Sequence, residues 1–209
     1  MSNPRVTGLY AITSAKLGVG DDLFDAVAAA LRGGARFIQY RDKSSAPATR
    51  QRLAQRLLML CREQGASLII NDDVDLCQAV GADGVHLGRD DLSLTQARQR
   101  LGAGKLIGVS CYNQPQLAQA AQRGGADYVA FGSFFPSTSK PDAVRAPLSL
   151  LSEAASCCDL PIVAIGGINA VNGQRLIAAG AAALAVISAV FEQADVEQAA
   201  REIATLFNH

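Results

Sequence analysis

The stretch Gly33-Gly34-Ala35-Arg36-Phe37-Ile38-Gln39-Tyr40-Arg41-Asp42-Lys43 combines a turn, a strand and a polar end. Its two glycines favour a tight turn after a helix, because glycine adopts left-handed backbone conformations at little cost. Alternate side chains of a strand share one face, so Gln39, Arg41 and Lys43 are expected to point the same way. An amide and two cations on one face favour a phosphate or pyrophosphate site. A strand that simply runs out into a solvated loop is the alternative at this point.

The same step from helix to strand recurs along the chain. It is repeated at Gly81-Ala82-Asp83-Gly84, Gly124-Gly125-Ala126-Asp127 and Gly180-Ala181-Ala182-Ala183. Polar and varied segments follow the other ends of the strands, at 41–45, 71–73, 89–91, 135–145 and 166–169. Short turns at one pole and polar loops at the other are typical of a (β/α)₈ barrel, whose chemistry lies beyond the carboxyl ends of the strands.

Short apolar runs alternate with longer Ala-, Leu-, Gln- and Arg-rich segments from one end to the other. Strands are expected at 9–13, 36–40, 68–70, 84–87, 106–110, 128–131, 162–165 and 183–187. Helices are expected at 22–32, 48–64, 74–80, 93–101, 114–123, 148–156, 171–179 and 196–207. Strict alternation predicts an α/β protein with a parallel sheet. We expect a compact TIM barrel, with residues 1–209 forming a single domain; a doubly wound open sheet is the alternative.

Composition narrows the functional classes. The chain has 209 residues, 49% hydrophobic and 18% charged, which is enough to build a sizeable core. Basic and acidic residues number 19 each, so the chain lacks the basic excess of a dedicated nucleic-acid binder. No membrane span or signal peptide is expected. The five cysteines have no metal-like spacing, and their odd number favours reduced thiols in a cytoplasmic protein.

Candidate metal ligands follow the third and fourth predicted strands. Asp72 and Asp91, with the amide of Asn71 nearby, provide the oxygen donors that suit Mg²⁺ bound to a phosphate-bearing substrate. Each carboxylate has an alternative role, since Asp after a strand often caps the next helix. His86 is expected to be a packed, hydrogen-bonded histidine rather than a metal ligand.

A second anion site is expected after the seventh and eighth strands. Gly166-Gly167 would let a ligand approach the backbone, and Ser188 ends the eighth strand region. The long segment 137–147 is a candidate lid, with a flexible surface loop as its alternative. The sequence contains no recognisable nucleophile–base order, which favours catalysis by positioning and charge stabilisation. Two anion sites, one with a metal, suggest two phosphorylated substrates and a pyrophosphate leaving group.

These motifs together resemble the thiamine phosphate synthase family over essentially the whole chain. The matching segments are Gln39-Tyr40-Arg41-Asp42-Lys43, Asn71-Asp72, His86-Leu87-Gly88-Arg89-Asp90-Asp91, Gly108-Val109-Ser110, Ser137-Thr138-Ser139-Lys140, Ile165-Gly166-Gly167-Ile168 and Ala185-Val186-Ile187-Ser188. The resemblance implies a transferase that condenses hydroxymethylpyrimidine pyrophosphate with hydroxyethylthiazole phosphate. Pyrophosphate bound to Mg²⁺ would depart first, and the thiazole nitrogen would then capture the pyrimidine carbocation.

The resemblance also implies roles for individual residues. Arg41, Lys43, Ser110 and Lys140 would be catalytic, and Asp72 and Asp91 would bind Mg²⁺. The pyrimidine pyrophosphate would contact Gln39, Tyr40, Arg41, Asp42, Lys43, Asn71, Ser110 and Lys140, although Tyr40 and Asp42 lie on the opposite strand face and are not expected to be catalytic. The thiazole phosphate would contact Ser137, Thr138, Ser139, Gly167, Ile187 and Ser188. A homo-oligomer is compatible with the sequence.

Two departures from the family pattern are visible. Ser137 and Ser139 stand where the family usually has Thr, which keeps the hydroxyl donor and removes a methyl group. Arg89 stands where the family often has Gln, and it adds a charge near the expected metal site. Two rival functions share the barrel: a thiazole tautomerase, and a non-catalytic protein that binds phosphorylated metabolites. Neither would need both the basic residues after the second strand and the two carboxylates.

Overall fold

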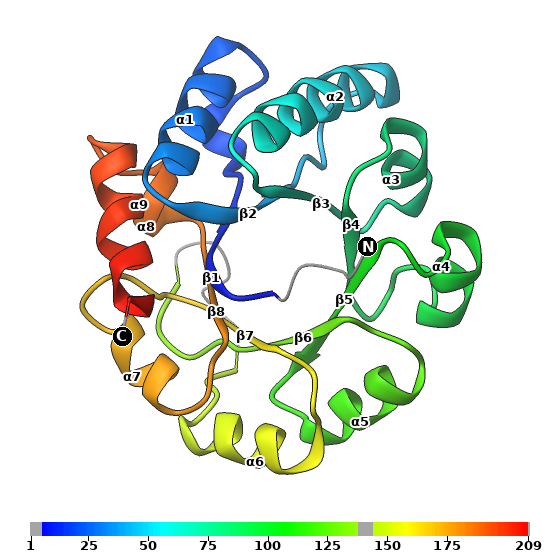
Figure 1. The fold of residues 1–209 in the computed structure, drawn as a ribbon, viewed down its shortest axis with the longest axis vertical. Helices are drawn as coiled ribbons and strands as arrows, with labels where there is room; N and C mark the ends of the chain where they lie inside the picture. Colours follow the sequence, from blue (N-terminus) through cyan, green and yellow to red (C-terminus); the bar gives the residue numbers. More distant parts are fainter. Residues whose placement is uncertain (1–5, 138–143, 209) are drawn as a thin grey trace.

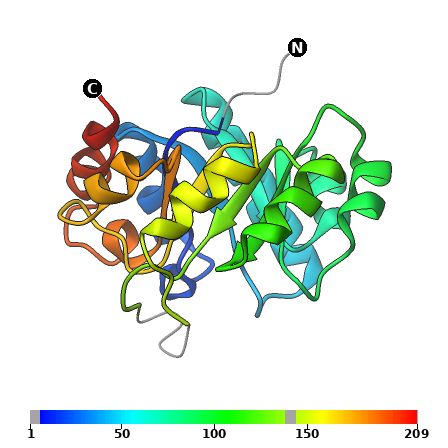
Figure 2. The ribbon, with the colours of Figure 1, turned by 90° about the horizontal axis from the view of Figure 1, so that it is seen from below.

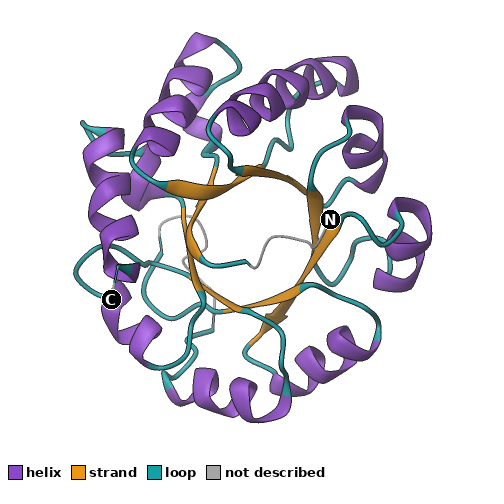
Figure 3. Cartoon of the chain, viewed as in Figure 1, coloured by secondary structure: helices purple, strands orange, loops and turns teal. Residues whose placement is uncertain are grey.

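The chain folds into a closed barrel of eight parallel strands in sequential order, surrounded by helices (Figure 1). The computed structural model describes residues 6–137 and 144–208. The strands form the inner ring and the helices the outer one (Figure 3). Strand β8 pairs with β1, with Gly8 opposite Ala183 and Ala11 opposite Val186, which closes the ring. The predicted TIM barrel is confirmed, and the open sheet is excluded.

The strands are β1 (Gly8–Ile12), β2 (Ala35–Tyr40), β3 (Ser67–Asn71), β4 (Gly84–Leu87), β5 (Leu106–Tyr112), β6 (Tyr128–Phe131), β7 (Ile162–Ile165) and β8 (Ala183–Val186). The helices are α1 (Asp21–Arg32), α2 (Pro47–Glu63), α3 (Val74–Val80), α4 (Leu94–Leu101), α5 (Pro115–Arg123), α6 (Ser149–Cys157), α7 (Gly173–Ala178), α8 (Ser188–Phe191) and α9 (Val196–Ala204). Two short 3₁₀ turns, η1 (Ala15–Leu17) and η2 (Thr205–Phe207), complete the described elements. Within the described residues, none of the helices is both long and apolar enough to cross a membrane.

Most predicted elements are present with boundary shifts of one or two residues. The helix expected at 196–207 ends at Ala204 and continues as the 3₁₀ turn η2. The elements α8 and η1 were not predicted, because four and three residues are too short to show helical periodicity. Strand β8 ends at Val186, since Ile187 already leaves the extended conformation to precede α8.

Two glycines in the opening stretch serve different purposes. Gly34 has a φ of +101°, so it supplies the left-handed step into β2. Gly33 is in the right-handed region, and a Cβ there would lie 2.4 Å from the carbonyl oxygen of Glu197. The first turn of the stretch therefore needs glycine once for conformation and once for close packing against α9.

The barrel has an outer core between strands and helices and an inner core enclosed by the strands. The inner core includes Tyr10, Phe37, Ile69, Leu106, Tyr128 and Val163. Small side chains, among them Ala130 and Ala185, line the same interior at pocket depth. Seen from the side in Figure 2, the helices flank the barrel, and the loop after β6 extends from one end of it. Large side chains thus fill the interior, and small ones nearer the mouth leave room for a pocket.

Candidate active site at the carboxyl ends of the strands

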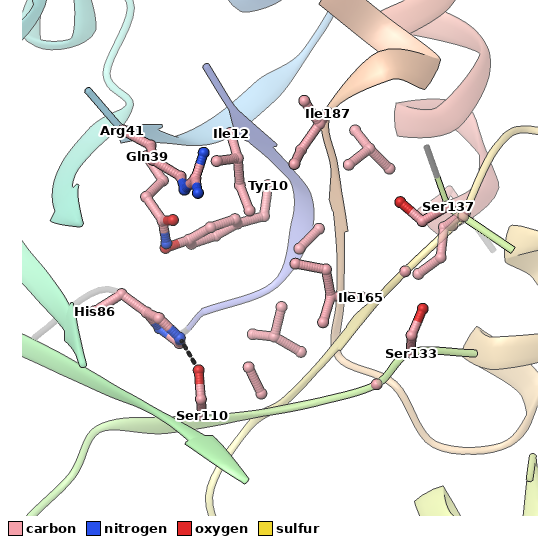
Figure 4. A pocket seen from close by; sticks show the side chains of 18 of the residues that line it. Tyr10, Ile12, Gln39, Arg41, His86, Ser110, Ser133, Ser137, Ile165 and Ile187 are labelled. Carbon is pink, nitrogen blue, oxygen red and sulfur yellow. Dashed lines mark hydrogen bonds between the residues drawn. The ribbon is translucent and has the colours of Figure 1, made fainter. Parts of the chain in front are cut away.

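A pocket of about 240 Å³ opens at the carboxyl ends of the strands. Its apolar wall is formed by Ile12, Ala130, Val163, Ile165, Ala185 and Ile187. Its polar groups are Tyr10, Gln39, Arg41, Asn71, His86, Ser110, Tyr112, Tyr128, Ser133, Ser137 and Ser188, with the backbone of Gly166 and Gly167. In Figure 4 the Gln39 and Arg41 side chains lie on one side of the pocket, and Ser133 and Ser137 lie on the other. The pocket therefore offers polar groups at both ends of an apolar slot.

The alternation expected after β2 is present at the pocket. Gln39 is almost fully enclosed, at 4% exposure, and its Nε2 donates to the Tyr10 hydroxyl over 2.8 Å. Arg41 lines the pocket, and its backbone N–H donates to the Thr13 hydroxyl over 2.9 Å. Thr13 is buried, so this bond holds the backbone of Arg41 in place. Lys43 lies further out, with Nζ 3.1 Å from the carboxylate of Asp72.

Tyr40 and Asp42 are not brought to the pocket. Tyr40 is buried in the outer core, and its hydroxyl donates to Asp42 over 3.0 Å. Asp42 accepts from the backbone N–H groups of Ser44 and Ser45, at 3.0 Å each. Burial acts to raise the pKa of Asp42, but the hydrogen bonds from Ser45 and Ser44 outweigh it and hold that pKa below its usual range. The structure gives Asp42 the role of shaping the loop that carries Lys43.

The carboxylate of Asp72 is not used as a helix cap. Asp73 caps α3 instead, because its Oδ1 accepts from the backbone N–H of Leu76 over 2.8 Å. Asp72 itself has a φ of +66°, a conformation rarely adopted by residues other than glycine, asparagine and aspartate. Its side chain is 31% exposed and contacts the Lys43 ammonium. The unusual backbone conformation thus occurs at a predicted site residue.

Asp91 is likewise not the cap of the following helix. Ser93 caps α4, while Oδ2 of Asp91 accepts from the backbone N–H of Gly88 over 2.6 Å. This bond folds the segment after β4 back on itself. Arg89, in that segment, places its guanidinium 4.8 Å from the centre of the Tyr112 ring, and the backbone N–H of Arg89 donates to the Tyr112 hydroxyl. The extra charge of Arg89 is therefore stacked on an aromatic ring.

The donor set after β3 and β4 fits Mg²⁺. Asp72 and Asp91 are partly exposed oxygen donors, and Asp72 already holds one positive group, the Lys43 ammonium. Among the described residues no three His, Cys, Asp or Glu side chains gather closely enough to hold a metal by themselves. Mg²⁺ commonly uses one or two carboxylates and completes its shell with water and phosphate oxygens. A metal held here would therefore depend on an anionic ligand.

The Gly166-Gly167 pair is required by the packing of the loop after β6. A Cβ on Gly166 would lie 2.0 Å from the Ser133 hydroxyl oxygen, and one on Gly167 would lie 2.2 Å from the carbonyl oxygen of Pro136. Both glycines also have positive φ angles, +107° and +61°. Ser137, Gly167, Ile187 and Ser188 all line the pocket near this pair. Thr138, Ser139 and Lys140, also expected here, lie outside the described residues.

Three polar side chains inside the barrel form hydrogen bonds that the sequence did not reveal. Tyr10 and Tyr128 were not predicted as site residues, and His86 was predicted only as a packed histidine. Tyr10 and Tyr128 are completely buried, and their hydroxyls lie 2.9 Å apart. Tyr128 also contacts Nδ1 of His86 at 3.1 Å, and Nε2 of His86 lies 2.9 Å from Ser110 Oγ. The expectation of a packed, hydrogen-bonded His86 is confirmed. Alternation along β1 and β6 was the available signal, since both tyrosines share the inward face with pocket residues.

The His86–Ser110 contact raises the question of a nucleophile. In serine hydrolases the second ring nitrogen of the histidine meets a carboxylate, which stabilises the imidazolium ion. Here that nitrogen meets the neutral hydroxyl of Tyr128. The thiol next to Ser110 is also unsuited, because burial raises the pKa of Cys111 to about 12. The site thus favours binding and charge stabilisation over covalent catalysis.

Comparison with known proteins agrees with this geometry. The family model described as thiamine monophosphate synthase matches residues 9–190. The thiamine-phosphate synthase of Chromobacterium violaceum is 54% identical over 206 residues, covering 98% of each chain. That of Thiobacillus denitrificans is 52% identical, covering 96% of this chain and 94% of the other. The structure of thiamine phosphate pyrophosphorylase from Pyrococcus furiosus superposes with a TM-score of 0.86 at 36% identity, covering 96% and 95% of the two chains.

Proposed function

The chain belongs to the thiamine monophosphate synthase family of transferases, and we propose the substrates and reaction course that its pocket supports. Its activity is that of a thiamine-phosphate synthase. The proposed substrates are hydroxymethylpyrimidine pyrophosphate and hydroxyethylthiazole phosphate. The bond from the pyrimidine methylene carbon to pyrophosphate breaks, and the thiazole nitrogen then bonds to that carbon. The products are thiamine phosphate and pyrophosphate.

The observation that carries the proposal is the apolar slot with polar groups at both ends. Arg41 lies at one end, with Lys43 further out in the loop that follows β2, so two cations are available to a departing pyrophosphate. Cations placed where negative charge develops stabilise the transition state without a covalent intermediate. Lys43 is paired with Asp72 over 3.1 Å in this structure. A pyrophosphate carries more negative charge than one carboxylate, so the Lys43 ammonium would transfer to it on binding.

Mg²⁺ is part of the proposal. Asp72 and Asp91 would hold the ion, with the amide of Asn71 close by at the end of β3. The ion would neutralise charge on the pyrophosphate as it leaves. The side chains of the protein then orient the pyrimidine against the slot and keep its reacting carbon facing the thiazole end.

The thiazole phosphate is proposed to bind at the opposite end. Ser137, Gly167 and Ser188 line the pocket there. The assignments of Thr138 and Ser139 to the thiazole phosphate and of Lys140 to the pyrophosphate rest on the family resemblance alone. Ile187 forms part of the apolar wall, against which a thiazole ring can pack.

We also propose a cytoplasmic location and a homo-oligomeric assembly. The five cysteines are free thiols in the structure, which supports a reducing compartment such as the cytoplasm. Light scattering of the purified protein measures whether the chain forms a homo-oligomer.

The reaction is tested with purified protein, both substrates and Mg²⁺, by measuring thiamine phosphate with and without a chelator. We expect product formation that stops when the metal is removed. Absence of product would refute the proposed function. Product formation that is insensitive to the chelator would remove Mg²⁺ from it.

Two sets of variants locate the pyrophosphate site. Arg41→Ala and Lys43→Ala are expected to lower kcat strongly, whereas Arg100→Ala, which removes an exposed cation paired with Asp75, serves as the matched control. Effects below about threefold for both site variants would show that the site is misplaced. Asp91→Ala is expected to weaken Mg²⁺ binding measured calorimetrically in the presence of pyrophosphate. An unchanged binding isotherm would remove Asp91 from the ligand set.

A further inference from the structure

Five polar side chains form a continuous hydrogen-bond chain across the inside of the barrel. It runs from Gln39 on β2 to Tyr10 on β1, then to Tyr128 on β6, His86 on β4 and Ser110 on β5. The successive donor–acceptor distances are 2.8, 2.9, 3.1 and 2.9 Å. Figure 4 shows the Gln39 amide beside the Tyr10 hydroxyl and the His86–Ser110 bond at the other end. Both ends of the chain, Gln39 and Ser110, line the pocket.

The direction of the first bond is set by chemistry. The amide nitrogen of Gln39 can only donate, so the Tyr10 hydroxyl oxygen accepts from it. Tyr10 is 1% exposed, and the other hydrogen bond of its hydroxyl is to Tyr128. The Tyr10 proton must therefore point to the Tyr128 oxygen. Burial raises the pKa of both tyrosines, so both hydroxyls keep their protons.

The remaining bonds follow in the same direction. Tyr128 accepts from Tyr10, so its own proton goes to Nδ1 of His86. That nitrogen then carries no proton, and the proton of the neutral ring is on Nε2, which donates to Ser110 Oγ. The reverse direction would leave the Tyr10 proton without an acceptor in an enclosed site, which is unfavourable. In an imidazolium ion Nδ1 would donate to Tyr128. The Tyr128 proton would then go to Tyr10, and the Tyr10 proton would again have no acceptor.

We propose that Tyr10, Tyr128 and His86 are positioning residues that form a one-directional chain, holding His86 as the neutral Nε2–H tautomer and leaving the Ser110 hydroxyl as a donor toward the pocket. Ser110 is then not a nucleophile, because Nε2 of His86 already carries a proton and cannot take another from it. Gln39 is held with its Nε2 on Tyr10, which leaves its oxygen to accept from a ligand.

The consequence for binding rests on the proposed function. An aminopyrimidine ring carries an N–H donor on its amino group and acceptors on its ring nitrogens. The amino group matches the Gln39 oxygen on β2, and a ring nitrogen matches the Ser110 hydroxyl on β5. A neutral His86 also avoids a positive charge beside the carbocation that the proposed reaction forms.

The orientation of the Gln39 amide sets the direction of the hydrogen-bond chain. If the amide were turned over, its oxygen would accept from Tyr10 and every bond in the chain would reverse. His86 would then carry its proton on Nδ1, and Nε2 would accept from Ser110 as a general base does. The two directions predict opposite tautomers, so the tautomer decides between them.

The direct test is ¹⁵N NMR of the full chain labelled at histidine. The sequence contains two histidines, His86 and His209, and a His209→Gln variant assigns the signals. We expect long-range ¹H–¹⁵N spectra near neutral pH to show an unprotonated Nδ1 and a protonated Nε2 for His86. A protonated Nδ1, alone or together with Nε2, would overturn the proposal. This measurement needs no substrate, and it leaves the five hydrogen-bonded side chains unchanged.

Two variants test whether the tyrosines set the tautomer. Tyr128→Phe removes the donor to Nδ1, and we expect the two nitrogen shifts of His86 to move toward each other as both tautomers become populated. Tyr10→Phe leaves the Tyr128 donor in place, so the tautomer should be retained. Tyr40→Phe, which removes a hydroxyl bonded to Asp42 outside the barrel interior, is the spectroscopic control. An unchanged His86 spectrum in Tyr128→Phe would show that the chain does not control the ring.

Kinetics separate positioning from simple structural support. Tyr10→Phe frees the Gln39 amide, so we expect KM for the pyrimidine substrate to rise by about fivefold or more, with a smaller change in KM for the thiazole substrate. Equal changes in both values would contradict a positioning role. Failure of the wild type to make thiamine phosphate would refute the proposed function and leave the NMR result standing, and the wrong tautomer in an active enzyme would refute only the inference.

Discussion

Gly108 on β5 makes room for Tyr128, and its replacement by alanine should damage both the fold and the polar chain. A Cβ on Gly108 would lie 2.0 Å from Cζ of Tyr128, 2.4 Å from Cε2 and 2.4 Å from the hydroxyl oxygen. Non-bonded carbon atoms pack at about 3.5–4.0 Å, so the ring would have to retreat by roughly 1.5 Å. The Tyr128 hydroxyl bonds to Tyr10 at 2.9 Å and to His86 at 3.1 Å, and such a shift would disrupt them.

The expected cost of Gly108→Ala follows from these two effects. Forcing a methyl group into a packed core costs about 1–3 kcal/mol. Two buried hydrogen bonds contribute about 1 kcal/mol each. We therefore expect the free energy of unfolding to fall by roughly 3–5 kcal/mol, a large part of the 5–15 kcal/mol of a typical domain. Production of thiamine phosphate should fall as well, because both ends of the polar chain lose their support.

The assay is urea unfolding followed by circular dichroism, arranged as a double-mutant cycle with Tyr128→Leu. Leucine lacks the three atoms that the new methyl group would meet, so Gly108→Ala should cost less than about 1 kcal/mol in that background. Gly104→Ala, where no atom lies within 4 Å of the added Cβ, is the matched control and should change stability by less than about 0.5 kcal/mol. A cost for Gly108→Ala below about 0.5 kcal/mol, or an equal cost in both backgrounds, would refute the steric argument.

Three further predictions address the backbone of the site, a helix cap and pH. Thr13→Val removes the hydroxyl that accepts from the Arg41 N–H at 2.9 Å, so urea unfolding should show a loss of about 1–2 kcal/mol and KM for the pyrimidine substrate should rise; unchanged values would mean that the bond does not hold Arg41. Asp73→Ala removes the cap of α3 on the Leu76 N–H at 2.8 Å, which should cost about 1 kcal/mol in the same assay, and a neutral result would contradict the capping role. Burial raises the pKa of three thiols to about 12, against about 8.5 in an unfolded chain. The unfolded state then loses protons first as the pH rises, so this stabilisation is complete below about pH 8.5 and is lost toward pH 12. Urea midpoints should fall from about pH 8.5 upward, and a flat profile to pH 10 would be the contrary result. The three thiols are Cys61, Cys77 and Cys111.

The fold was predictable because its signals are local and repeated. Most αβ turns carry glycine (the turn 158–161 before β7 does not), the strands are short and largely apolar, and polar residues follow most of them. The order of elements could therefore be predicted without long-range information. The elements α8 and η1 were not predicted, because four and three residues are too few to show the hydrophobic periodicity of a helix. Closure of the sheet is a long-range property. Alternation predicted only a parallel sheet, and the short turns at one pole with polar loops at the other favoured the closed barrel over the open sheet.

The site was predicted less completely, and the reason is visible at β2. Of the three residues expected on one face, Gln39 and Arg41 line the pocket, whereas Lys43 lies further out beside Asp72. Tyr40 and Asp42 do not line the pocket. The family resemblance added Tyr40 and Asp42 to the binding set, and the structure gives these two residues partners in each other and in the loop that follows. The binding role that the family resemblance implies for Tyr40 and Asp42 stays a prediction.

Tyr10 and Tyr128 were missed for a different reason. They lie 118 residues apart, and a tyrosine within an apolar strand is indistinguishable from a core residue unless its hydroxyl partner is known. The predicted site residues follow the strands, whereas these two hydroxyls meet inside the barrel.

The inward faces of β4 and β5 nevertheless contain a local trace of the polar chain. Gly84 precedes His86 by two positions, and Gly108 precedes Ser110 by two, so each polar residue stands one step nearer the mouth than a glycine on the same face. A Cβ on Gly108 would collide with the Tyr128 ring, and one on Gly84 would lie 2.3 Å from the carbonyl oxygen of Leu106. The glycines weaken their strands, and such a cost persists where another group needs the space. The Tyr128 ring occupies the space above Gly108, and its hydroxyl contacts His86. At Gly108 the absent side chain lets the Tyr128 ring of the neighbouring strand β6 reach over β5 to His86 on β4. At Gly84 the space is taken by Leu106 of the neighbouring strand β5. In both cases the glycine two residues before an inward polar residue makes room for a residue of the next strand.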